Sequence, residues 1–179
     1  MTLCSRLLLL AALMTSLTVQ AQEVRVVTRV VTDTIPAWKT WKENGFTMNH
    51  PGKWTVERAA LGDTLVAFRN VVPGKESSTP VVAVIVQGVE GKATPLQKRL
   101  KKKKADEVEF IPSDEPDADA SRSECRYTLM GIRFHLLERV VEKGDRSYIL
   151  TYVAPEEAYE ESLFLAEAML NSFSAPADR

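Results

Sequence analysis

The sequence has few of the residues that most often carry chemistry. Its 179 residues include two cysteines and two histidines, and no HExxH, CxxC, GxSxG, GxGxxG or Walker A pattern occurs. The usual signatures of a zinc protease, a redox dithiol, a serine hydrolase and a nucleotide-binding protein are therefore missing. Neither charge is in excess, since 23 Lys and Arg balance 24 Asp and Glu to a formal net charge of −1. That balance excludes a globally basic nucleic-acid-binding protein, and the 45% hydrophobic content is that of a globular domain.

The N-terminal segment predicts a secretory signal peptide over residues 1–21. Arg6 precedes an apolar stretch of 11 residues at 7–17, and the small-residue ending Val19-Gln20-Ala21 follows it. A membrane-spanning helix needs roughly 20 apolar residues, so we expect cleavage after Ala21 and no transmembrane span in the mature chain. An uncleaved N-terminal anchor is the alternative. The predicted location is periplasmic or extracellular.

After cleavage the chain is divided into an N-terminal leader at residues 22–42 and a single domain at residues 43–175. Of the two cysteines only Cys125 remains, so no internal disulfide is available in a compartment that would allow one. We expect Cys125 to be a buried structural thiol rather than a reactive or intermolecular one. We also expect no bound metal and no organic cofactor.

Alternating apolar residues predict several strands in the first half of the chain. Residues 23–32 form a β-branched strand of the leader, and residues 46–49 and 54–57 form a hairpin across the turn His50-Pro51-Gly52. Two further strands are predicted at residues 64–69 and 80–87. The second of them is apolar on both faces, which is typical of a strand inside a covered sheet.

A short basic helix is predicted from Thr94 to about residue 105. Thr94 is placed to cap it, Pro95 suits the first helical position, and Leu96 and Leu100 form a thin apolar line. A strand follows at residues 108–111. An acidic, proline-containing loop comes next, for which a calcium site and a solvated loop are the two interpretations; its acids are Asp114, Glu115, Asp117 and Asp119.

The second half of the chain predicts an antiparallel meander and a closing helix. Three alternating runs over residues 124–154 are joined by Met130-Gly131 and by Lys143-Gly144-Asp145. A helix then begins at Pro155 and repeats large apolar residues at helical spacing, namely Tyr159, Leu163, Ala166, Leu170 and Phe173. The predicted fold class is therefore α+β, an antiparallel sheet covered by helices.

These elements resemble the PsbP-like family, a superfamily that includes PsbP and the periplasmic DcrB-like proteins. The resemblance is carried by GFTMNHPGKW, TLVAFRN, SSTPVVAVIV, the basic helix, EKGDRSYILTY and AYEESLFLAEAMLNSF, and it spans about residues 45–173. It implies an α-β-α sandwich that usually acts as a binding or assembly factor without a recognised catalytic centre.

Two surfaces are candidates for binding a partner. The first is a run of six cations within seven positions, Lys98, Arg99, Lys101, Lys102, Lys103 and Lys104, which is interpreted either as a solvated helix face or as a patch for an acidic protein, an anionic lipid or a lipopolysaccharide phosphate. The second is the pair Trp38 and Trp41, which either anchors a partner or packs onto the domain.

Two hypotheses about function follow. The first is a non-catalytic exported module that binds a protein or an anionic envelope component. The alternative is a small periplasmic hydrolase or ligand carrier with a spatially assembled site. Polar groups converging on His50 or His135 in the largest cleft would favour the alternative, although we expect both imidazoles to be ordinary surface or half-buried groups.

Overall fold

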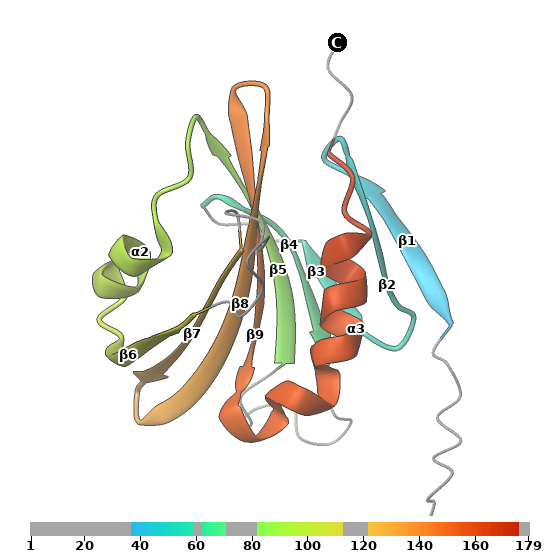
Figure 1. The fold of residues 1–179 in the computed structure, drawn as a ribbon. Coiled ribbons are helices and arrows are strands. Elements are labelled where there is room, and N and C mark those ends of the chain that lie inside the picture. Colours follow the sequence, from blue (N-terminus) through green and yellow to red (C-terminus); the bar gives the residue numbers. More distant parts are fainter. Residues whose placement is uncertain (1–36, 59–61, 71–81, 113–121, 176–179) are drawn as a thin grey trace, which may run out of the picture. The chain divides into compact units, whose positions relative to one another are not determined.

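The computed structural model describes residues 37–58, 62–70, 82–112 and 122–175, which lie in one compact unit extending from Ile35 to Arg179. The described residues form nine strands, two α-helices and one short 3-10 helix (Figure 1). The strands are β1 (Trp38–Glu43), β2 (Phe46–Pro51), β3 (Thr55–Arg58), β4 (Thr64–Asn70), β5 (Val82–Glu90), β6 (Asp106–Ile111), β7 (Arg122–Leu129), β8 (Ile132–Lys143) and β9 (Arg146–Pro155). The helices are α2 (Leu96–Lys102), the 3-10 helix η1 (Glu156–Ala158) and α3 (Tyr159–Asn171).

Seven strands form one antiparallel sheet in the order β3-β4-β5-β9-β8-β7-β6. Strand β5 lies inside this sheet between β4 and β9, which confirms the interior position predicted for the strand at residues 80–87. The meander β7-β8-β9 is also confirmed. Its first turn places Met130 and Gly131 at φ 53° and 78°, and its second places Gly144 at φ 59°. Paired positive φ values match the right-handed twist of the flanking strands.

Helix α3 covers one face of the sheet. Its Tyr159, Ala166 and Leu170 are buried against inward-facing sheet residues such as Phe68 and Leu150. The Tyr152 hydroxyl donates a hydrogen bond to the backbone carbonyl of Tyr159 at 2.7 Å, which ties the start of the helix to β9.

Helix α2 covers part of the opposite face. Leu96 and Leu100 lie one turn apart and pack on Cys125, Tyr127 and Leu136. Cys125 is fully buried, as predicted, and burial, followed by the neighbouring Glu138 carboxylate, raises its pKa to about 12. The fold is therefore α+β with a helix on each face of the sheet, as expected.

The predicted hairpin over residues 46–57 is wrong. β2 pairs with β1 in a separate two-stranded sheet, with Trp41 opposite Met48, whereas β3 pairs with β4. The turn at Gly52 sends the chain from one sheet to the other, and alternation alone does not specify which strand is the partner. Two backbone hydrogen bonds between Thr47 and Ser174, at 3.0 and 2.9 Å, hold β2 to the chain that follows α3.

The predicted start and end of the basic helix are also wrong. Thr94 makes no capping hydrogen bond, Pro95 occupies the N-cap position with ψ 140°, and the helix ends at Lys102 rather than near residue 105. Lys104 at φ 58° turns the chain into β6. The predicted strand at residues 23–32, the signal peptide and the four acids of the loop after β6 lie outside the described residues.

Candidate functional site

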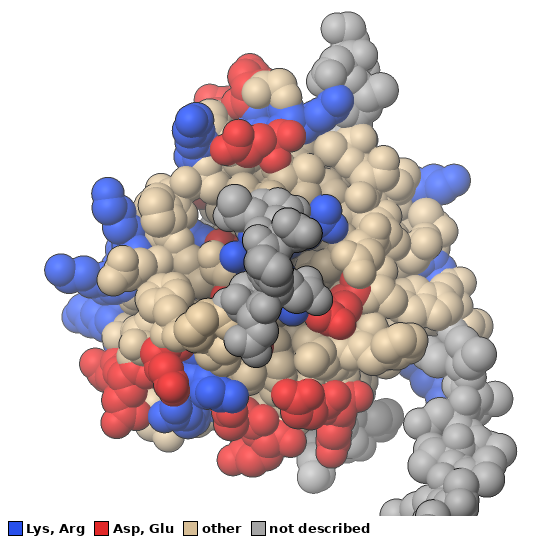
Figure 2. Space-filling model, in the orientation of Figure 1, with Lys and Arg blue, Asp and Glu red and all other residues tan. Residues whose placement is uncertain are grey.

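Helix α2 presents a lysine face to solvent. Leu96 and Leu100 point to the sheet, and the lysine face consists of the exposed lysines of the helix and of the two residues that follow it, Lys98, Lys101, Lys102, Lys103 and Lys104. All five side chains are exposed, and none forms an ion pair with another described residue. Figure 2 shows the blue side chains projecting on the side of the molecule where Figure 1 places α2.

Arg99, the sixth cation of the run, lies apart from the lysine face. Its guanidinium donates to both carboxylate oxygens of Glu138 on β8, and its Nε donates to the Thr94 carbonyl at 2.9 Å. The Glu138 side chain is 3% exposed and that of Arg99 22%. This ion pair holds α2 on the sheet and fixes the direction in which the lysine face points.

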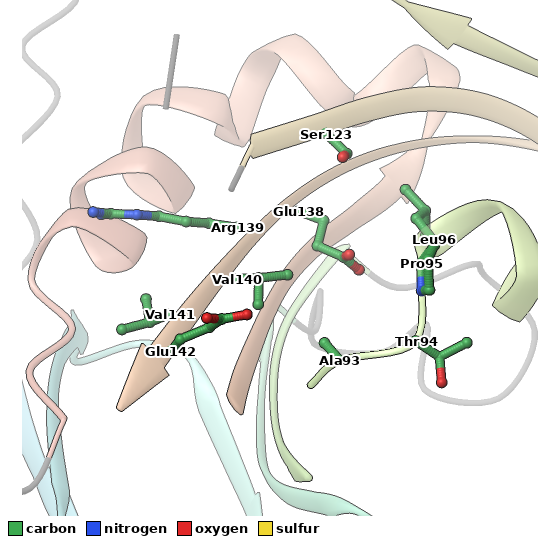
Figure 3. A pocket seen from close by; sticks show the side chains of 10 residues that line it. All are labelled: Ala93, Thr94, Pro95, Leu96, Ser123, Glu138, Arg139, Val140, Val141 and Glu142. Carbon is green, nitrogen blue, oxygen red and sulfur yellow. The ribbon is translucent and has the colours of Figure 1, made fainter. Parts of the chain in front are cut away.

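Two clefts border α2. The larger, a cavity of about 660 Å³, lies between β8 and the chain that leads into α2 (Figure 3). It is lined by Ala93, Thr94, Pro95, Leu96, Ser123, Glu138, Arg139, Val140, Val141 and Glu142. In Figure 3 the Glu138 side chain points toward Pro95 and Leu96, while Arg139 points to the other side of the strand.

The smaller cleft, about 130 Å³, lies beneath α2. Its walls come from α2, from Lys103 after it and from five strands of the sheet, and its polar lining groups are Thr64, Gln87, Arg99, Lys103, Tyr127 and Thr151. Neither cleft is lined by a histidine. The polar groups that line these two clefts are therefore cations, hydroxyls, an amide and the carboxylates of Glu138 and Glu142.

The two tryptophans of β1 differ in their surroundings. Trp41 packs its ring edge-on against Phe68 at 6.2 Å between centroids, and the Arg58 guanidinium lies 5.8 Å from the Trp41 ring centroid. Trp38 is exposed. An ion pair between Glu43 and Arg58 joins β1 to β3, whereas α2 packs on β7 and β8. The structure therefore does not bring the two tryptophans together with the lysine face.

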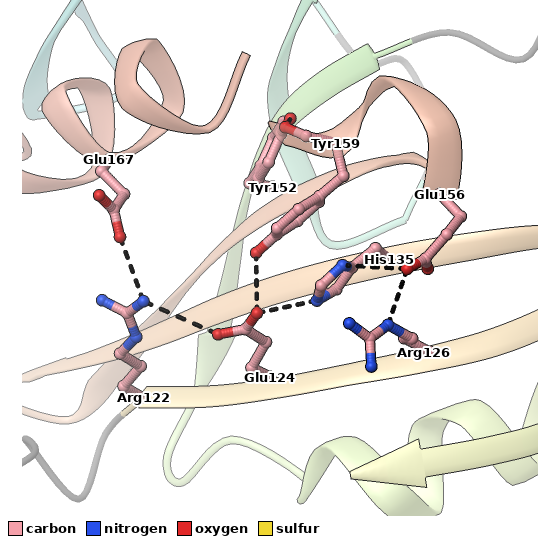
Figure 4. Close-up of polar contacts among 8 residues, drawn as sticks. All are labelled: Arg122, Glu124, Arg126, His135, Tyr152, Glu156, Tyr159 and Glu167. Atoms are coloured by element: carbon pink, nitrogen blue, oxygen red, sulfur yellow. Dashed lines mark hydrogen bonds and ion pairs between the residues drawn. The ribbon is translucent and has the colours of Figure 1, made fainter. Parts of the chain in front are cut away.

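His135 lies in a buried polar network that the sequence analysis did not find (Figure 4). The imidazole is 3% exposed, so the expectation of a surface or half-buried group is wrong. Its Nε2 is 2.8 Å from Glu124 Oε1, and its ring stacks on Tyr159 at 3.5 Å between centroids. The Tyr159 hydroxyl donates to the same Glu124 oxygen at 3.2 Å.

Glu156 and two arginines complete this network. Glu156 Oε1 lies 3.9 Å from His135 Nδ1 and accepts a hydrogen bond from Arg126 Nε at 2.8 Å. Arg122 bridges Glu124, at 3.8 Å, and Glu167 on α3, at 3.1 Å. Together these contacts join β7 and β8 to η1 and α3.

The chemistry of the network is that of a structural clamp. Burial, followed by the Glu124 charge, raises the pKa of Tyr159, so the phenol keeps its proton and remains a donor. Among the described residues, His135 contacts Glu124, Glu156 and the Tyr159 ring, and none of these is a serine, threonine or cysteine that an imidazole could activate as a nucleophile. Cys125 is on β7 but packs under α2, on the opposite face of the sheet.

His50 is buried as well, against the expectation from the sequence. It is 5% exposed, its ring lies 4.9 Å from that of Phe68, and its Nδ1 donates to the Pro51 carbonyl at 3.1 Å. Burial lowers the pKa of His50, the backbone hydrogen bond opposes this shift, and the charge of Lys39 adds to it. The neutral imidazole is therefore favoured.

Among the described residues, no group of three or more His, Cys, Asp or Glu side chains could hold a metal ion. Within the same ranges, no helix has the length and apolar character needed to cross a membrane.

No protein-family model matches the chain, and no curated protein matches its sequence. Among solved structures, cyanobacterial PsbP (CyanoP) from Synechocystis sp. PCC 6803 matches over 79% of this chain and 94% of its own, with a TM-score of 0.56 and 15% identity. LpqN, described as involved in cell envelope biogenesis of Mycobacterium tuberculosis, matches over 77% and 90% at a TM-score of 0.49 and 12% identity. A protein from Bacteroides thetaiotaomicron VPI-5482 matches over 75% and 46%, with a TM-score of 0.43 and 13% identity.

At these identities the similarity bears on architecture and not on activity. The CyanoP match includes nearly the whole of that protein, and the seven-stranded antiparallel sheet with a helix on each face agrees with the resemblance drawn from the sequence. The chain has the PsbP-like fold.

Proposed function

We propose that the chain is an exported, non-catalytic binding or assembly module of the cell envelope, and that its partner, a protein or an anionic envelope component, docks on the lysine face of α2. The observation that carries this proposal is the set of five exposed lysines without ion pairs among the described residues. Like charges three or four positions apart on a helix repel by roughly 0.2–0.5 kcal/mol per pair. An anionic partner would remove this repulsion.

The Arg99–Glu138 ion pair supports the proposal because it orders the helix that carries the lysines. A seven-residue helix is too short to be stable alone. Its buried leucines and this ion pair hold it on the sheet, so the lysine face is positioned before a partner arrives. Preorganisation lowers the entropic cost of binding.

The surroundings of the two histidines favour this proposal over a hydrolase or ligand carrier. That alternative needs an imidazole in a cleft with polar groups around it. His135 is instead covered by Tyr159 and contacts carboxylates of the structural clamp, and His50 packs on Phe68. Neither histidine lines the two clefts beside α2.

Charge reversal on the lysine face tests the proposal. The mature protein is used to capture partners from its own envelope fraction, in parallel with a triple variant in which Lys101, Lys102 and Lys104 are changed to Glu. The matched control reverses three exposed lysines far from α2, Lys39, Lys42 and Lys53. We expect the retained component to be lost with the first variant, kept with the control, and bound more weakly as salt rises. Equal retention by both variants without salt dependence would move the candidate surface to Trp38.

Export is tested separately. Intact-mass analysis of the protein from the envelope fraction should show a chain beginning at Gln22, because the predicted cleavage follows Ala21. A full-length cytoplasmic chain beginning at Met1 would contradict this part of the proposal.

A further inference from the structure

Exposed apolar side chains gather at one corner of the sheet. Six large hydrophobic residues are exposed in the described part of the chain, and four of them form what we call the apolar corner: Val108 (36% exposed), Phe110 (42%), Met130 (94%) and Ile132 (39%). The other two, Trp38 and Phe164, lie on β1 and α3. All four come from β6, from β8 or from the turn that leads into β8, at the β6 end of the seven-stranded sheet. Exposed apolar side chains on one part of a surface mark sites of contact with proteins or membranes.

The apolar corner lies on the same side of the sheet as α2. Phe110 pairs with Cys125, which packs under α2, and Ile132 pairs with Leu129, which packs against the same cluster. Side chains of directly paired residues point to the same face.

The acids of β6 lie on the other face. Glu107 and Glu109 approach the Arg133 guanidinium at 3.9 and 3.2 Å, and Glu107 accepts a hydrogen bond from the Thr128 hydroxyl at 2.8 Å. At the apolar corner, the two acids of β6 therefore lie on the face opposite to α2. On the face shared with α2, Glu138 is paired with Arg99, and Glu138 and Glu142 line the larger cleft.

Met130 is the most exposed member of the corner, and its position is not explained by packing. It occupies the tip of the β7–β8 turn at φ 53°, a conformation that suits Gly or Asn and costs other residues roughly 1–2 kcal/mol. An exposed side chain regains none of this through burial. The turn requires this positive φ, but it does not require a large apolar side chain, so the hairpin does not account for a methionine at this position.

The lysine face begins beside this tip. Asp106 is the register partner of Thr128, so the chain entering β6 from Lys103 and Lys104 runs alongside the end of β7, next to the turn. Figure 1 shows the start of β6 and the β7–β8 turn at the same corner of the sheet.

We propose that the apolar corner inserts into the surface of an anionic lipid bilayer while the lysine face contacts the lipid headgroups. This inference rests on the proposed function and names the anionic envelope component. The tip carries a 94% exposed apolar side chain beside cations that form no ion pair with the described residues. This combines the two contributions that hold proteins at a membrane surface, apolar burial and attraction to anionic lipid. A groove for a protein segment would instead need a concave apolar surface.

Vesicle sedimentation of the mature protein tests the inference. The probes are vesicles of phosphatidylglycerol mixed with phosphatidylcholine and vesicles of phosphatidylcholine alone. We expect binding to the first only, a loss on the order of a hundredfold in the Lys101, Lys102 and Lys104 reversal variant, and no such loss in the Lys39, Lys42 and Lys53 control.

Neutral substitutions test the apolar contribution without changing charge. Met130→Gln should weaken binding by about tenfold, whereas Phe164→Gln, which changes an apolar residue of α3 that is 79% exposed, should not. Circular dichroism of each variant establishes that it is folded. Equal binding of the two variants would overturn the inference.

The outcome also separates this inference from the proposed function. If the wild-type protein does not sediment with the anionic vesicles, the bilayer is not the partner and the inference falls. The proposed function survives that result if a captured envelope protein still depends on the lysine face.

Discussion

Replacing Arg99 by Met should show that Arg99 stabilises the fold, in contrast to the lysines beside it. Met fills the space of the Arg side chain but leaves the Glu138 carboxylate, 3% exposed, without its partner. Removing one partner of a buried ion pair costs about 3–5 kcal/mol. Arg99 is 22% exposed, and Glu138 lines the larger cleft of about 660 Å³, from which water can reach the carboxylate, so we expect about 3 kcal/mol. For a domain of this size that corresponds to a fall in Tm of about 6–12 °C.

Urea unfolding followed by circular dichroism measures this loss, with the Lys101, Lys102 and Lys104 reversal as the comparison. Those exposed charges should alter the free energy of unfolding by no more than about 1 kcal/mol. The double variant Arg99→Met with Glu138→Gln should recover most of the loss because the buried charge is gone. A loss below about 1 kcal/mol in the single variant, or no recovery in the double, would refute the reasoning.

Three further predictions concern the buried groups. Tyr159→Phe removes the 3.2 Å hydrogen bond to Glu124 and should lower the free energy of unfolding by about 1.5 kcal/mol; an unchanged urea midpoint would contradict the clamp. Burial raises the pKa of Cys125 to about 12, so in the folded protein that begins at Gln22 this thiol should react with thiol reagents only as fast as the protein unfolds. Fast labelling of the native protein would show an accessible thiolate. Because burial lowers the pKa of His50 below 6.5, its contribution to stability is present above that pH and is lost as the pH falls through the folded-state pKa. A His50→Leu variant should therefore lose less stability on acidification than the wild type, and a steeper loss would reverse the sign of the argument.

Local patterns predicted the elements whose partners are neighbours in the chain. The meander β7-β8-β9 was predicted because each strand pairs with the next and Met130-Gly131 and Gly144 mark the turns. The hairpin over residues 46–57 was wrong because β2 turns back on β1, whose polar alternation in WKTWKE was placed in the leader. Alternation indicates a strand but carries no information about its partner.

The candidate site was predicted only where exposure follows from helical spacing. Leu96 and Leu100 already indicate that the lysines between and beyond them point outward. The partner of Arg99 could not be predicted, because Glu138 lies on β8, 39 positions further along the chain. The His135 network was missed for the same reason, because Glu124 comes from β7 and Tyr159 from α3.

The unequal length of the two helices has a consequence for amide hydrogen exchange. α3 has 13 residues and joins the larger of the two buried clusters, whereas α2 has seven and buries two leucines. Amides of α2 should therefore exchange through local openings that leave the sheet intact, and those of α3 and β9 only through global unfolding. The lysine face then belongs to a unit that is less stable than α3, so a ligand held there would slow exchange in α2 far more than in α3 and β9, and the protection pattern itself would locate the contact.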